Sequence, residues 1–210
     1  MGSEGSNNAR NMPAFNILIE SLPTSLEIDG QTYRIDADFR TSLRTILAFE
    51  DQSLATVEKQ RILIENLFYE VPDNTEAAFT AAMRFINGGG EAEGEQEEKA
   101  NWRVYSFQQD APYIFSAFRL THGIDLQEIE FLHWHKFLYL FTDLGEDTFF
   151  LRLVNLRKRL KDGTATKEER TAARSMSAIV QLPEEVHMTP EEMASADRFM
   201  DLLRASENGN

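Results

Sequence analysis

The densest apolar segment of the chain is YSFQQDAPYIFSAFRLTHGIDLQEIEFLHWHKFLYLF, residues 105–141. Its apolar residues recur at intervals of three and four, which places them on one face of a helix. A break at His122-Gly123 divides the segment into two helices, and a third apolar run with the same spacing follows over residues 149–160. These three helices are predicted to form the centre of a mainly α-helical fold.

Capping residues indicate where these helices begin and end. Asp110 is suited to cap the first helix, with Pro112 in its first turn, and Gly123 can close it in the left-handed conformation. The sequence DLQE at 125–128 resembles a capping box and predicts the start of the second helix. Asp-Gly at 162–163 is expected to end the third helix.

Before this segment the apolar spacing changes to two. Alternating apolar residues flank Asp29-Gly30, and Asp-Gly between such runs favours a hairpin because a type I′ turn needs positive φ at both central residues. A two-residue loop would pair Leu26 with Tyr33. Helix starts are then expected at Asp38, Ser53 and Asn74. The helix from Asn74 is expected to turn inward Ala78, Ala81, Ala82 and Phe85.

Composition divides the chain into segments. The stretch GGGEAEGEQEEKA combines glycine with repelling carboxylates, which is typical of a flexible linker, with a tether or electrostatic decoy as the functional alternative. Capping patterns at Thr166–Glu169 and Thr189–Glu192 predict two later helices. The predicted segments are a disordered extension (1–14), a β-hairpin plus helices (15–87), the acidic linker (88–100), a central helical core (101–182) and a C-terminal helix with its tail (183–210). Residues 15–182 are expected to form one domain.

Charge and composition exclude several classes of function. The 210 residues carry a net charge of −14, which argues against nucleic-acid binding and favours neutral or basic protein partners. No uncharged apolar run reaches the roughly 18 residues that a membrane span needs. The chain has no Cys, which excludes disulfides and thiolate zinc sites and is consistent with a reducing cytoplasm.

No local motif indicates catalysis. His133 and His135 lie two apart on the predicted second helix, so their side chains should point about 200° apart and could not share a metal. A nucleophile elbow, a phosphate-binding loop and a dinucleotide-binding glycine motif are all missing from the sequence. We therefore expect no enzyme activity, no catalytic residue, no metal and no cofactor.

Two features have a structural and a functional interpretation. The basic run RKRLK at 157–161 either complements the negative end of its helix or docks an acidic partner. Most of the 15 Phe residues are expected in the core, whereas exposed aromatic residues would anchor a partner. The candidate partner-binding residues are Phe131, Trp134, Phe137, Phe141, Phe149, Met193, Phe199, Met200 and Leu203.

Four pieces of the sequence carry a resemblance to a known family. They are NILIESLPTSLEIDGQTYRIDADFRTSL, AFED, YSFQQDAPYIFSAF and HGIDLQEIEFLHWHKFLYLF, which together span about residues 15–159. The chain thereby resembles the tail assembly chaperones of long-tailed bacteriophages and prophages of Gram-positive bacteria. Members commonly have a second Trp where this chain has His135, so a role that needs two adjacent Trp residues does not transfer.

The resemblance implies a non-enzymatic assembly factor. Such a protein would bind and solubilise the tape-measure protein and help recruit tail-tube subunits, in the host bacterial cytoplasm and without remaining in the mature virion. Amphipathic grooves on an acidic protein would suit a long, apolar, helical client. Self-association along that filament is left open.

Two other functions are consistent with the residues. One is a structural tail completion or connector protein, which would remain in the virion. The other is an acidic inhibitor that mimics nucleic acid, which would need carboxylates spaced on a folded face. The densest acidic run lies instead in the predicted linker.

Overall fold

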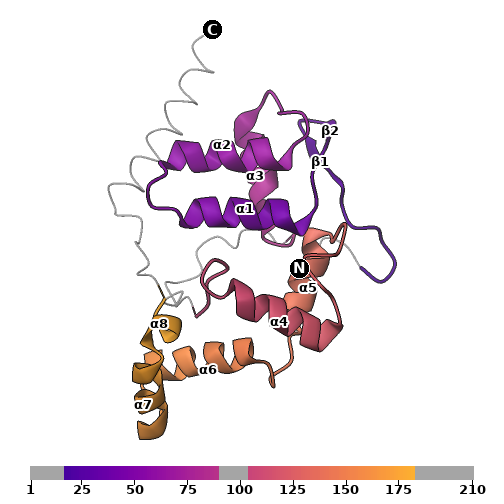
Figure 1. The fold of residues 1–210 in the computed structure, drawn as a ribbon. Helices are drawn as coiled ribbons and strands as arrows, with labels where there is room; N and C mark the ends of the chain where they lie inside the picture. The colour runs from indigo at the N-terminus through magenta and orange to yellow at the C-terminus, as the bar shows by residue number, and fades with distance from the viewer. Residues whose placement is uncertain (1–16, 90–103, 183–210) are drawn as a thin grey trace, which may run out of the picture.

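The computed structural model describes residues 17–89 and 104–182, which form a mainly helical fold with one small β-hairpin (Figure 1). The strands are β1 (Ser25–Ile28) and β2 (Gln31–Arg34). The helices in these described residues are α1 (Phe39–Glu50), α2 (Thr56–Leu67), α3 (Thr75–Ile86), α4 (Ala111–His122), α5 (Trp134–Thr142), α6 (Phe149–Lys161), α7 (Lys167–Ser175) and α8 (Ser177–Val180). The mainly helical prediction is thus confirmed.

The hairpin has the predicted register. Leu26 lies opposite Tyr33 in an antiparallel pair, and Asp29 and Gly30 have φ angles of 51° and 78°. Both values are positive, as a type I′ turn requires. In the described part of the chain the sheet contains β1 and β2 alone.

Helices α1, α2 and α3 pack on one another above the second half of the chain (Figure 1). Asp38 caps α1 by accepting a hydrogen bond from the Arg40 N–H at 3.0 Å, and Asn74 caps α3 by accepting from the Ala77 N–H at 3.0 Å. Helix α2 begins later than predicted, because the Ser53 hydroxyl donates to the Asp51 carboxylate at 2.7 Å and does not cap the helix.

The second helix of the central segment also begins later than predicted. The backbone N–H of Ile129 donates to the Asp125 carbonyl at 3.0 Å, which closes a single turn and not a continuing helix. The chain then extends and pairs His133 with Asp38 in an isolated bridge. Because residues 37–39 take up the backbone hydrogen bonds of residues 132–134, α5 starts only at Trp134.

Helices α4, α5 and α6 form the second half, with α7 and α8 packed at the far end of α6 (Figure 1). Gly123 closes α4 with a φ of 68°, as predicted. Thr166 and Glu169 form the predicted capping box of α7, with hydrogen bonds of 3.1 and 3.0 Å. None of the described helices is long and apolar enough to cross a membrane.

One continuous core joins the two halves. Phe137 in α5 stacks on Phe39 in α1 at 5.1 Å, on Phe118 in α4 at 4.9 Å and on Trp134 at 5.5 Å between ring centroids. The indole N–H of Trp134 donates to the Ile86 carbonyl at the end of α3 at 2.8 Å. Side chains from residues on both sides of the predicted linker therefore share this core.

Candidate functional site

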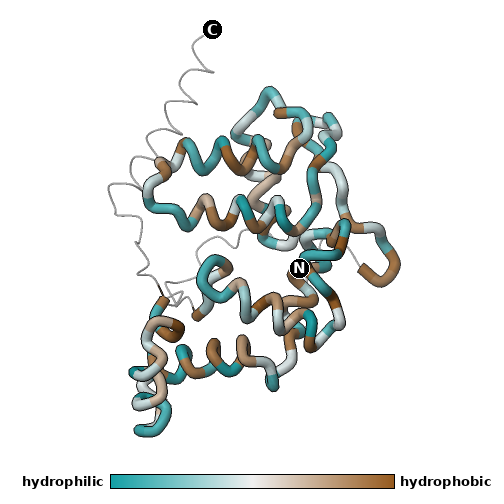
Figure 2. Tube along the Cα trace, in the orientation of Figure 1, coloured by the Kyte–Doolittle hydropathy of each residue, from teal (hydrophilic) through white to brown (hydrophobic). Residues whose placement is uncertain are grey.

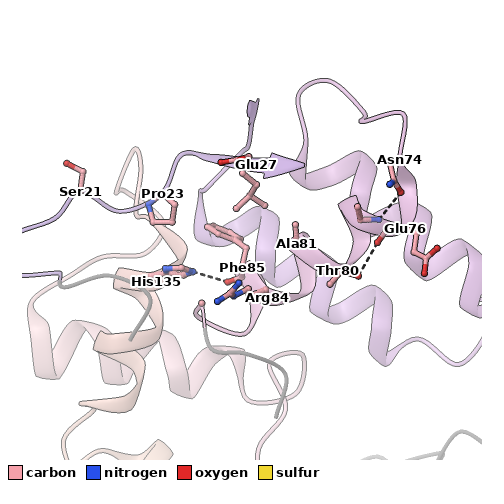
Figure 3. A pocket seen from close by; sticks show the side chains of 13 residues that line it. Ser21, Pro23, Glu27, Asn74, Glu76, Thr80, Ala81, Arg84, Phe85 and His135 are labelled. Atoms are coloured by element: carbon pink, nitrogen blue, oxygen red, sulfur yellow. Dashed lines mark hydrogen bonds between the residues drawn. The ribbon is translucent and has the colours of Figure 1, made fainter. Parts of the chain in front are cut away.

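An open groove of about 760 Å³ runs along α3 beside β1 (Figure 3). Pro23 and His135 lie at one end of it, and Asn74 and Glu76 lie at the other. Helix α3 presents one face to the groove and packs the adjacent face, with Ala78 and Ala82 fully buried, into the core. The groove therefore follows α3 for most of its length.

The floor of the groove is apolar and is formed largely by short side chains. Ala77 and Ala81 are one turn apart on α3 and half-buried, and Leu26 of β1 lines the same space. Phe85 closes the floor, with 2% of its surface exposed. Because two alanines stand where longer side chains would fill the space, a partner backbone can approach α3 closely.

Charged side chains border this floor unevenly. Glu27 and Glu76 both line the groove, and Asn74 holds a further carboxylate close by through a 2.8 Å hydrogen bond to Asp29. Arg84 lies toward the opposite end, near His135 (Figure 3). The groove thus has an acidic end at the start of α3 and a basic side chain near the end of this helix.

The two histidines lie closer together than predicted. His133 is the N-cap of α5 and so lies outside the helix, and its ring centroid is 5.2 Å from that of His135 in a T-shaped arrangement. His133 Nε2 is 2.9 Å from the Pro23 carbonyl, and His135 Nε2 is 2.9 Å from the Phe85 carbonyl. Each Nε2 therefore donates, and His133 Nδ1 accepts from the His135 N–H at 3.1 Å.

Burial favours the neutral form of both histidines. Loss of solvent lowers the pKa of both His133 and His135, while the hydrogen bonds to Pro23 and Phe85 oppose that effect. Both side chains are accordingly neutral at neutral pH. Across the described residues, no cluster of three or more His, Cys, Asp or Glu side chains is suited to hold a metal ion.

Exposed apolar side chains precede the groove-lining residues Ser21 and Pro23 in the chain, and a further one occurs at Phe131. Leu18 and Ile19 are 88% and 80% exposed, and Ile17 is also exposed, forming the brown loop at the right of Figure 2. Phe131 is 54% exposed, and its ring centroid is 6.5 Å from that of His133, which bonds to Pro23. We refer to Ile17, Leu18, Ile19 and Phe131 as the rim patch.

The structure separates the predicted partner-binding residues. Phe131 and Phe149 are exposed, whereas Trp134 and Phe137 are each 1% exposed and belong to the core. Phe141 is half-buried against Phe150 and Tyr105. Met193, Phe199, Met200 and Leu203 lie outside the described residues, as do the extension 1–14 and most of the predicted linker. Phe131 and Phe149 are thus the described candidates that a partner can reach.

Two predicted charge roles also change. Asp110 makes no side-chain capping bond to α4, and its carboxylate instead meets the Arg157 guanidinium at 2.6 and 2.9 Å. Arg157 is 3% exposed in this pair, so it cannot belong to a basic docking patch. Lys158, Arg159 and Lys161 do lie in the last turn of α6, where cations complement the helix dipole.

Sequence patterns do not predict the groove. Ala81, which is predicted to face inward with Ala78 and Ala82, does pack against the core, but it is half-buried and also lines the groove. The relevant signal in the sequence is the set of small residues in α3. They leave more than one face of this helix without bulky side chains, whereas packing against the core needs only one such face.

A family model described as Bacteriophage Gp15 protein matches residues 18–182, which is well over half of the chain. No curated protein and no solved structure matches the chain.

Proposed function

Because the chain belongs to the Bacteriophage Gp15 protein family, we propose that it is a tail assembly chaperone that binds and solubilises the tape-measure protein. It would also help to recruit tail-tube subunits, act without catalysis in the host bacterial cytoplasm, and be absent from the mature virion. The family match supports a role in phage structure or assembly. The chaperone role within it is our inference.

The observation that carries this proposal is the groove along α3, together with the exposed apolar side chains of the rim patch. A folded protein with an open groove of about 760 Å³, and with Leu18 and Ile19 exposed, offers apolar surface for another chain. A net charge of −14 keeps such a protein soluble while its apolar surface is in use. Both properties suit a factor that shields an apolar client.

The client chemistry explains why weak binding would suffice. A tape-measure protein is long and helical, so many copies of a small chaperone can engage it along its length. Copies that also contact one another along the filament would bind it with a higher total affinity than one copy alone. Each single contact still dissociates readily, which would let tube subunits replace the chaperone as the tail grows.

Co-expression with the neighbouring tape-measure gene tests the proposal. We expect the tape-measure protein to become soluble and to co-purify with this chain. A tape-measure protein that stays insoluble and unbound, while this chain is folded, would overturn the chaperone role. Detection of the chain in purified virions would then favour the structural alternative, a tail completion or connector protein.

A further inference from the structure

We infer that the groove along α3 receives one amphipathic helix whose apolar face is flanked by basic side chains. The inference rests on the proposed function in one respect: it assigns that helix to the tape-measure client.

The shape of the floor favours a helix. Ala77 and Ala81 face the groove one turn apart, and a helix that crosses such small side chains can pack with its axis about 8 Å from that of α3. Asn74 and Phe85 both line the groove, so it follows about 16 Å of α3, or about three turns. Anchors at i, i+4, i+7 and i+11 of a client helix span this length.

The chemistry of the floor also favours a helix over an extended segment. Ala77, Ala81 and Leu26 offer no side-chain hydrogen-bonding groups to a bound backbone. A helix satisfies its own backbone N–H and C=O groups internally, whereas an extended chain would leave many of them unpaired on an apolar surface.

Charge identifies the flanks of that helix. Glu27 and Glu76 border the groove with Arg84 as the cation among its lining residues, and the chain as a whole carries a charge of −14. Lys or Arg beside the apolar stripe of the client would face these carboxylates. An acidic flank would meet two like charges, which is unfavourable.

The same reasoning disfavours the chain's own C-terminal segment as the occupant. Residues 189–204 carry four acidic side chains against two arginines, so this segment brings further negative charge to an already acidic border. A second copy of this acidic chain has the same disadvantage.

The first test uses a synthetic amphipathic helix with a leucine stripe flanked by Lys, and a twin peptide flanked by Glu. The Lys-flanked peptide should bind the full-length protein more tightly than its twin. Ala81→Glu should weaken that binding at least about tenfold, because it places a charge on the apolar floor. Ala172→Glu is the matched control, since it makes the same change at an exposed position on α7 and should leave binding unchanged.

A charge substitution tests the flanks separately. Glu27→Lys should weaken binding of the Lys-flanked peptide about two- to fivefold and reduce the preference over the Glu-flanked twin. Glu65→Lys on the exposed surface of α2 serves as the control and should change neither. Equal binding of both peptides to every variant would overturn the inference, with circular dichroism showing that each variant is folded.

The tape-measure protein then separates this inference from the proposed function. Co-purification with the wild-type chain and with Ala81→Glu alike would overturn the groove as the site while the chaperone role stands. If the Lys-flanked peptide binds as expected but the tape-measure protein does not, the groove assignment stands and the chaperone role fails. Self-association abolished by Ala81→Glu in sedimentation would identify a second copy as the occupant and overturn the inference.

Hydrogen exchange tests whether the chain's own C-terminal segment occupies the groove. If residues 189–204 filled the groove, Phe199→Asp with Leu203→Asp would release them and speed hydrogen exchange in α3. We expect exchange in α3 to be unchanged in this variant of the full chain. Faster exchange there would overturn the assignment to a partner helix.

Discussion

The Arg157 guanidinium and the Asp110 carboxylate form a bidentate ion pair in which both side chains are almost completely buried, at 3% and 0% exposed. Arg157 also donates to the carbonyls of Val180, Val104 and Ile179 at 2.9, 3.2 and 2.6 Å. Asp110 accepts in addition from the Ser106 N–H at 2.9 Å. The pair therefore fastens the segment before α4 and the turn of α8 to the same position on α6.

Removing one member of this pair should be strongly destabilising. Asp110→Asn or Arg157→Met leaves the opposite charge buried without its counterion, which costs about 3–5 kcal/mol of unfolding free energy. Urea denaturation followed by circular dichroism measures the loss. Glu169→Gln, which breaks the more exposed pair with Arg159, is the control and should cost far less unfolding free energy. Equal losses in the two cases would contradict a buried role for Arg157.

Stability should fall as the solution is acidified below pH 6.5. Burial lowers the pKa of His133 and His135 in the folded protein from an ordinary 6.5, so the unfolded chain binds protons more readily. The stabilisation is complete above about pH 6.5 and is lost as pH falls toward the folded-state pKa values. Each histidine can contribute up to about 1.4 kcal/mol per pH unit in that range.

Thermal melts at several pH values between 7.5 and 5 check this dependence. His133→Asn is an informative control, because Asn is a strong N-cap residue and can keep the start of α5 while removing one titrating group. Its melting temperature should fall less on acidification than that of the wild type. An identical pH dependence in this variant would show that His133 does not contribute.

Substitution of two phenylalanines of the central segment should have different effects on stability, because one is buried in the core and the other is exposed. Phe137 stacks on rings from α1, α4 and α5 and is 1% exposed, whereas Phe131 is 54% exposed. Phe137→Ala should lower the unfolding free energy by about 3–5 kcal/mol through the lost burial and the cavity left behind. Phe131→Ala should lower it by about 0.5 kcal/mol or less. Denaturant titration of the two variants measures the difference, and similar losses would contradict the placement of Phe137.

Local signals in the sequence were sufficient for much of this fold. Asp38, Asn74 and Thr166 each cap a helix through a backbone N–H two or three residues away, so both partners lie within one short window of sequence. The hairpin register followed from Asp29-Gly30 in the same way.

Distant contacts explain where local signals failed. Asp110 has the residue type of a cap but binds Arg157, which lies 47 positions away. The turn at Asp125 was expected to continue as a helix, but residues 132–134 bond to residues 37–39 instead. The groove likewise depends on β1 and α3 meeting, a relationship that no single window of sequence contains. Its alanines alone would indicate only a helix that packs closely.

Phe131 and Phe149 are the exposed aromatic residues through which a client is predicted to bind. Phe131 belongs to the rim patch, while Phe149 lies at the start of α6 with its ring centroid 4.7 Å from that of Tyr113. Large aromatic side chains that a partner covers commonly dominate binding, so Phe131→Asp should weaken client binding about fivefold or more. Phe149→Asp should do the same if the client also reaches α6.

Affinity for the co-expressed tape-measure protein, measured by titration of the purified complex, distinguishes the two positions. Val57→Asp is the control, because Val57 is 47% exposed on α2 and belongs neither to the groove nor to the rim patch. A loss at Phe131 alone would place the client at the groove and the rim patch and away from Phe149, which contacts Tyr113 of α4. A loss at both would require a client path that continues from the rim patch across α4 to the start of α6. Unchanged affinity in both variants, with each variant folded, would contradict the predicted role of these aromatic residues.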